Sequence, residues 1–175
     1  MKPLNKKLFI THFKKINQKD EDKVDWYHIS ERNYENCILE ALPKHFGYQI
    51  LLEKISEQWV DPDSLSTDEF DNDIWLVLKN DSKYGYLYLR SHNEDEFEMC
   101  RSFKELEKLY QDIHNKIIWK NSKQEMLEFI TSDEVKYMPY FYRWKHKNYD
   151  DFKQKNNDYR SFLNKAIAIL HRIKL

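Results

Sequence analysis

Glycine is scarce in this chain. Among 175 residues only Gly47 and Gly85 occur, far apart from each other. Loops that cradle phosphate groups need several glycines, because their backbone adopts positive φ and approaches the ligand closely. The composition therefore excludes the glycine-rich loops of Rossmann and P-loop nucleotide enzymes.

Cysteine is equally scarce, and the residues that bind metals are scattered. Cys37 and Cys100 are widely separated and have no CxxC spacing, so we expect two buried reduced thiols; a single regulatory disulfide is the alternative. The seven histidines form no HxH or HExxH pattern, and no GxSxG sequence surrounds a serine. We expect no catalytic residue, no metal site and no cofactor.

Long apolar runs are also missing. No stretch approaches the roughly 18 apolar residues that a membrane-spanning helix needs. Near the N-terminus, Thr11, His12 and two lysines interrupt the apolar residues where a signal peptide would keep a continuous core. We expect a folded cytoplasmic protein without a membrane segment, since 41% apolar residues exceed what disordered chains contain.

Charge is abundant and unevenly distributed, although the formal net charge is only −1. Residues 53–98 carry thirteen acidic and four basic side chains, a net charge of −9, whereas residues 99–175 carry ten acidic and sixteen basic ones, a net charge of +6. The middle of the chain is therefore an acidic block, and the C-terminal part is mildly basic.

Two consecutive helices are predicted before residue 62. After Ser30, apolar residues at helical spacing run as far as Pro43, where we expect the first helix to end. A second stripe, which ends near Pro62, consists of Tyr48, Leu51, Leu52, Ile55 and Trp59.

The pattern then changes to the alternation of strands. Residues 73–90 predict a β-hairpin, in which Ile74, Leu76 and Leu78 alternate with other apolar residues and a turn lies between Asn80 and Gly85. Residues 96–101 are a plausible third strand after a polar turn.

Two capping signatures and one apolar stripe predict helices in the rest of the chain. Ser102 with Glu105, and Ser122 with Glu125, have the spacing of a capping box. The first of these helices carries the stripe Leu106, Leu109, Tyr110, Ile113 and Ile117, and a C-terminal helix carries Tyr159, Phe162, Leu163, Ala166, Leu170 and Ile173 on one face.

Strands enclosed in sequence by helices indicate an α+β fold. We expect a small three- to four-stranded antiparallel sheet, containing the hairpin 73–90, flanked by about five to six helices. We expect residues 1–175 to form a single domain, with 122–175 as a candidate helical C-terminal subdomain.

The stretch from Tyr137 to Tyr149 combines six aromatic side chains with arginine, lysine and histidine. Aromatic rings beside cations bind single-stranded nucleic acids by stacking on the bases. The residues that would do so are Tyr140, Tyr142, Arg143, Trp144, Lys145 and Lys147. Core packing and a protein interface are the alternatives, because the chain has no recognised nucleic-acid motif and a slightly negative net charge.

The acidic block and the hairpin suggest a surface for a protein partner. A calcium loop of the EF-hand type is excluded because its glycine turn and closing glutamate are missing. The segment is either an ordinary solvated loop or a binding surface, since acidic side chains can mimic phosphate charge and attract a basic partner. The residues predicted to bind such a partner are Asp61, Asp63, Asp68, Glu69, Asp71, Asp73, Tyr84, Tyr86, Tyr88, Glu94, Asp95 and Glu96.

Both faces of the hairpin are apolar or aromatic, so both must be covered, either by helices of this chain or by a partner. Our hypothesis is an inhibitor, of the immunity or antitoxin type, that occludes the basic site of a toxin or nuclease and has no enzymatic activity. The alternative hypothesis is a nucleic-acid-binding accessory protein that uses residues 137–149. Neither is supported by a resemblance to a specific family.

Overall fold

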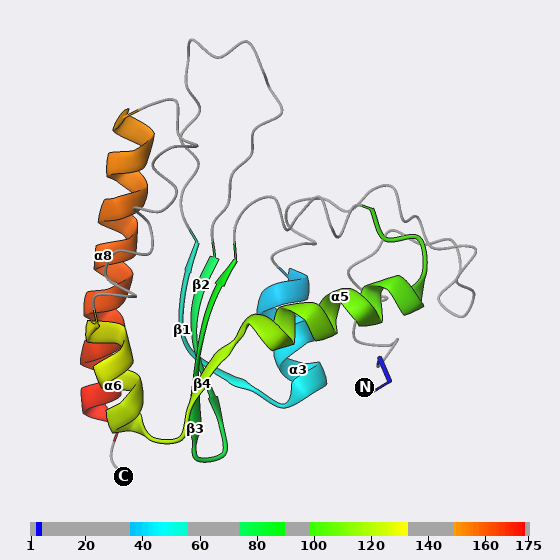
Figure 1. Cartoon of the computed structure of the whole chain (residues 1–175), viewed down its shortest axis with the longest axis horizontal. Coiled ribbons are helices and arrows are strands. Elements are labelled where there is room, and N and C mark those ends of the chain that lie inside the picture. The colour runs from blue at the N-terminus through cyan, green and yellow to red at the C-terminus, as the bar shows by residue number, and fades with distance from the viewer. Residues whose placement is uncertain (1–2, 5–35, 56–73, 90–98, 133–148, 174–175) are drawn as a thin grey trace. The chain divides into compact units, whose positions relative to one another are not determined.

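The computed structural model describes residues 3–4, 36–55, 74–89, 99–132 and 149–173 (Figure 1). The chain divides into two compact units. Unit 1 comprises Met1–Ile50 and Ser91–Ile117, and unit 2 comprises Leu51–Arg90 and Ile118–Leu175.

In unit 1, a π-helical turn η2 (Cys37–Ala41) leads directly into the short helix α3 (Leu42–Phe46). The prediction that the helix ends at Pro43 was wrong, because this proline lies in the first turn of α3. A proline has no N–H to donate to the preceding turn, and its ring crowds the carbonyl of that turn. The π turn just before Pro43 is wider than an α-helical turn and relieves this crowding. In it, the N–H of Leu42 bonds to the carbonyl of Cys37, five residues back. Helix α3 ends at Gly47, which has φ +79° and donates its N–H to Pro43 O.

Another helix of unit 1, α5 (Phe103–Lys116), begins at the predicted N-cap. Ser102 Oγ accepts the N–H of Glu105 at 3.2 Å, and the Glu105 carboxylate accepts the N–H of Arg101 at 2.6 Å. The predicted apolar stripe is buried along this helix. Its Tyr110 hydroxyl donates to Cys37 O at 3.1 Å, which ties α5 to the π turn.

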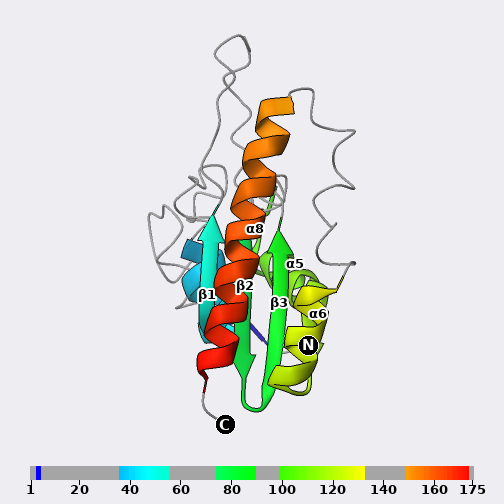
Figure 2. The same ribbon diagram turned by 90° about the vertical axis from the view of Figure 1, so that its left-hand side faces the viewer.

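Unit 2 is built on a four-stranded antiparallel sheet in the order β1-β2-β3-β4. Its strands are β1 (Gln49–Ile55, of which residues 51–55 belong to this unit), β2 (Ile74–Asn80), β3 (Lys83–Leu89) and β4 (Ile118–Lys120). Strands β1 and β3 run in one direction and β2 in the other (Figure 2).

The predicted hairpin is confirmed, but its turn is tighter than expected. The register pairs Ile74 with Leu89 and Asn80 with Lys83, so only two residues, Asp81 and Ser82, join the strands. Asp81 adopts φ +52°, which an aspartate tolerates better than most residues do.

The predicted second helix was wrong, because residues 49–55 form strand β1. The apolar residues from Tyr48 to Ile55 fit a helical period, but the left-handed Gly47 ends the preceding helix and the chain then pairs along β2. Every residue of β1 is partly buried or exposed, so the strand lacks the clean alternation that would have identified it.

The prediction of a strand at residues 96–101 was wrong for Met99–Arg101, the part that the structure describes. The N–H of Arg101 bonds to the Glu105 carboxylate at the start of α5, so it is not available to a sheet. The fourth strand is instead β4, where Ile118 pairs with Tyr86 and Lys120 with Tyr84.

Helices α6 (Lys123–Thr131) and α8 (Tyr149–Arg172) cover one face of the sheet, as both views show (Figures 1 and 2). Helix α6 begins at the predicted cap, where Ser122 Oγ accepts the N–H of Glu125 at 3.1 Å. The predicted face of α8 is confirmed, since Tyr159, Phe162, Leu163, Ala166 and Leu170 are all buried in the core of this unit.

The strand residues of this core include Trp75, Val77, Tyr84 and Tyr86, which share the helix-covered face. The α+β class and the antiparallel sheet are therefore confirmed. The described residues contain four α-helices and one π turn rather than five to six helices. Among them no helix is both long enough and apolar enough to span a membrane.

Candidate functional site

Most of the residues predicted to bind a partner lie outside the described residues. This holds for the acidic residues Asp61, Asp63, Asp68, Glu69, Asp71, Asp73, Glu94, Asp95 and Glu96, and for all six residues of the nucleic-acid alternative, Tyr140, Tyr142, Arg143, Trp144, Lys145 and Lys147. Only the three tyrosines of the hairpin are placed by the structure.

Two of these three tyrosines are not exposed to a partner. Tyr84 and Tyr86 are buried, with 6% and 1% of their surface exposed, and Tyr88 is partly buried. The Tyr86 ring meets Phe129 of α6 edge-on, at 5.7 Å between centroids, and its hydroxyl donates to Tyr159 of α8 at 3.4 Å. Helices of the same chain thus provide the cover that the apolar hairpin needs on this face.

Burial also changes the acidity of the tyrosine pair. It raises the pKa of Tyr159 to about 12 and the pKa of Tyr86 well above its ordinary value of 10. Both hydroxyls therefore stay protonated and neutral at physiological pH. The hydrogen bond between them lies inside the core of unit 2.

The strand register brings together the points from which the two acidic segments leave the sheet. Ile74 at the start of β2 pairs with Leu89 at the end of β3. Strand β1 is antiparallel to β2, so its last residue, Ile55, lies at the same end of the sheet (Figure 2). Residues 56–73 and 90–98 are therefore joined to neighbouring strand ends.

The opposite end of the sheet carries lysines that the sequence did not single out. Lys83 is exposed beside the hairpin turn. Lys79 lies over the Tyr84 ring at 5.9 Å, and Lys120 lies over the Phe129 ring at 4.7 Å. Only the strand register shows that these lysines gather at one end, because they come from three different strands.

An aromatic cluster in unit 1 contains His114, a histidine whose pKa is shifted. The ring of His114 stacks on Phe46 at 4.3 Å, and its Nδ1 forms a hydrogen bond with the hydroxyl of Tyr48. Partial burial lowers the pKa of His114, which favours the neutral ring. The cluster links Phe46 of α3 and the nearby Tyr48 to α5.

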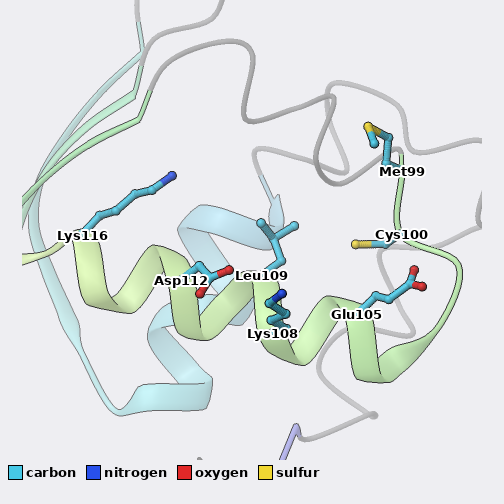
Figure 3. A pocket seen from close by; sticks show the side chains of 7 residues that line it. All are labelled: Met99, Cys100, Glu105, Lys108, Leu109, Asp112 and Lys116. Atoms are coloured by element: carbon cyan, nitrogen blue, oxygen red, sulfur yellow. The ribbon is translucent and has the colours of Figure 1, made fainter.

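An open pocket of about 460 Å³ lies along α5 in unit 1 (Figure 3). It is lined by Met99, Cys100, Glu105, Lys108, Leu109, Asp112 and Lys116. The two carboxylates and two lysines balance each other, and their side chains are spread along the helix without converging on a point. This arrangement does not favour a ligand of either charge.

Both thiols belong to the interior of unit 1. Cys37 and Cys100 are buried thiols that form no disulfide bond, in agreement with the expectation from the sequence. Burial raises the pKa of Cys37 to about 12, so this thiol is a poor nucleophile at neutral pH. Within the described residues, no group of three or more histidine, cysteine, aspartate or glutamate side chains is arranged to hold a metal ion.

No family model matches this chain, and searches of curated proteins and of solved structures found no match. Functional inference therefore depends on the residues and the geometry given above.

Proposed function

We propose that this protein binds another protein and acts as an inhibitor of the immunity or antitoxin type, occluding a basic, nuclease-like site of a toxin or effector. The observation that carries the proposal is the register that pairs Ile74 with Leu89. It supports the proposal because it joins two acidic segments of the sequence to the same end of one sheet.

The charge on these segments is large for their length. Residues 56–73 contain seven acidic side chains and no lysine or arginine, and residues 90–98 contain four acidic side chains and one arginine. Charges of one sign that are attached close together raise the association rate of an oppositely charged partner and discourage other partners.

We propose that the lysines at the other end of the sheet complete a charge polarity. Lys79, Lys83 and Lys120 lie near the hairpin turn, and the acidic segments leave from the far ends of β2 and β3. A basic partner is attracted to one end of such a sheet and repelled from the other, so the polarity favours one orientation of docking.

The buried tyrosines restrict how aromatic residues take part. Tyr84 and Tyr86 pack in the core of unit 2, so they support the strands, and of the three hairpin tyrosines only the partly buried Tyr88 has appreciable surface for a partner. We therefore propose that electrostatic attraction, more than an aromatic hot spot, selects the partner.

The first test is affinity capture from the native host using the tagged full chain, with and without nuclease treatment. We expect a basic protein retained in stoichiometric amount after nuclease treatment. Nucleic acid that leaves with salt, with no retained protein, would contradict the proposal and favour the alternative based on Tyr140 to Lys147.

The second test uses two variants with equal changes of charge. Glu69→Lys with Asp71→Lys should slow association with the captured protein about tenfold or more at low salt, and the difference should shrink at high salt. Asp112→Lys with Glu128→Lys alters two exposed acidic residues of helices α5 and α6. Equal slowing by both pairs would mean that net charge alone matters, which would refute a local acidic surface.

A further inference from the structure

The strand register and two helix ends gather basic side chains at one end of unit 2. Lys79 lies opposite Tyr84 and Tyr84 lies opposite Lys120, so these residues form a row across β2, β3 and β4 beside the hairpin turn. Lys123 is the first residue of α6, and its Nζ donates to the carbonyl of Ile173 at 2.9 Å, which brings the end of α8 to the same place. Both views show the hairpin turn, the start of α6 and the end of α8 at this end (Figures 1 and 2).

We call this surface the basic end and define it by five side chains: Lys79, Lys83, Lys120, Lys123 and Arg172. The segments that meet there are residues 79–83, 118–125 and 170–173. They contain these five cations and two carboxylates, those of Asp81 and Glu125, which leaves a net charge of +3.

The contacts of these cations orient them without neutralising them. The Lys79 amine lies 5.9 Å from the centre of the Tyr84 ring, and the Lys120 amine lies 4.7 Å from the centre of the Phe129 ring. Lys83 and Arg172 are exposed. In the part of the chain that the structure describes, none of the five cations is ion-paired with a carboxylate.

We infer that the basic end binds the sugar–phosphate backbone of a nucleic acid. Lysine and arginine side chains bind phosphates by charge and release counterions from the nucleic acid, and these contacts carry no sequence information. The inference is separate from the inhibitor proposal, because it uses the opposite end of the sheet from the acidic segments. It also uses no residue of the stretch 137–149.

The burial of the neighbouring rings favours phosphate over an acidic protein as the ligand. Tyr84 and Phe129 expose only 6% and 8% of their surface, so they support the amines without offering aromatic surface to a partner. The cores of protein interfaces are rich in apolar and aromatic side chains, whereas phosphate contacts depend on charge. We therefore expect binding to nucleic acid of any sequence.

The test measures binding of a short fluorescent DNA duplex to the full chain by anisotropy at several salt concentrations. The variant combines Lys79→Gln, Lys83→Gln and Lys120→Gln. We expect binding to weaken at least about tenfold at low salt, and the slope of log Kd against log salt concentration to fall by about 2–3, since each lost phosphate contact lowers it by about 1.

A matched control removes the same charge elsewhere. Lys104→Gln, Lys108→Gln and Lys116→Gln change three exposed lysines of α5 and should leave binding nearly unchanged. A second variant, Lys83→Gln with Arg172→Gln, changes only exposed side chains of the basic end. It should weaken binding several-fold without moving the urea midpoint of unfolding, which separates lost contacts from lost folding.

Four outcomes would overturn the inference. The unaltered chain does not bind the duplex at low salt, or the α5 control weakens binding as much as the basic-end variants do, which would mean that net charge alone acts. Polyglutamate displaces the duplex at an equal concentration of charge, which would favour an acidic protein as the ligand. Binding survives in both basic-end variants and is lost in Trp144→Ala with Lys145→Ala, which would place the nucleic-acid site in residues 137–149.

Discussion

Truncating Phe162 should reveal how much of the stability of unit 2 depends on the packing of α8. The side chain is fully buried, and its ring centroid lies 6.3 Å from those of both Trp75 and Tyr86. Replacing a buried phenylalanine by alanine removes its burial energy and leaves a cavity, and together these effects lower the free energy of unfolding by about 3–5 kcal/mol. For a chain of this length, each kcal/mol corresponds to roughly 2–4 °C in Tm.

The measurement is urea unfolding of Phe162→Ala, followed by tryptophan fluorescence and by circular dichroism. The matched control is Asn164→Ala, an exposed position two residues further along α8, which should change the free energy of unfolding by less than about 0.5 kcal/mol. A loss below about 1 kcal/mol for Phe162→Ala, with the urea dependence unchanged, would refute the packing of α8 against Trp75 and Tyr86.

Two further predictions concern the helix cap and the buried hydroxyls. Ser122→Ala should lower the free energy of unfolding by about 1 kcal/mol, because the N–H of Glu125 loses its side-chain acceptor; an unchanged urea midpoint would contradict the cap. Stability should also fall as pH rises from 10 toward 12, because the unfolded chain releases the Tyr159 proton near pH 10, whereas the folded chain holds it up to a pKa of about 12. Unfolding measured at stepped pH should show a smaller decline for Tyr159→Phe, and identical declines would exclude this cause.

The sequence predicted those parts of the fold whose signals are local. Ser102 and Ser122 each lie three residues before a glutamate, and both are observed N-caps. The hairpin and the buried face of α8 were also predicted, because alternation and helical spacing appear there without competing patterns.

The predictions failed where contacts between distant parts of the chain determine the secondary structure. The residues of β1 have a good helical period, and only Gly47 and the pairing with β2 make them a strand. Strand β4 is short, but its β-branched and aromatic residues, Ile118 and Trp119, directly after the end of α5, are a signal that could have located it.

Of the candidate site, only the acidic composition could be predicted from the sequence. The acidic segments are evident in the sequence, but the register that joins them to one end of the sheet is not. The place of Tyr86 could not be predicted either, because an aromatic side chain in an alternating strand fits an interface and a core equally well. The presence of α6 and α8 on that face of the sheet assigns Tyr86 to the core.

The order in which the elements appear along the chain affects its synthesis. Strands β2 and β3 form a local hairpin, but α6 and α8, the helices that cover Trp75 and Tyr86, come later in the chain. While the chain emerges from the ribosome, the aromatic face of the hairpin therefore stays uncovered until α6 and α8 have been made. Exposed strands with apolar faces are prone to aggregation, so nascent or C-terminally truncated chains of this protein should depend on chaperones far more than the finished protein does.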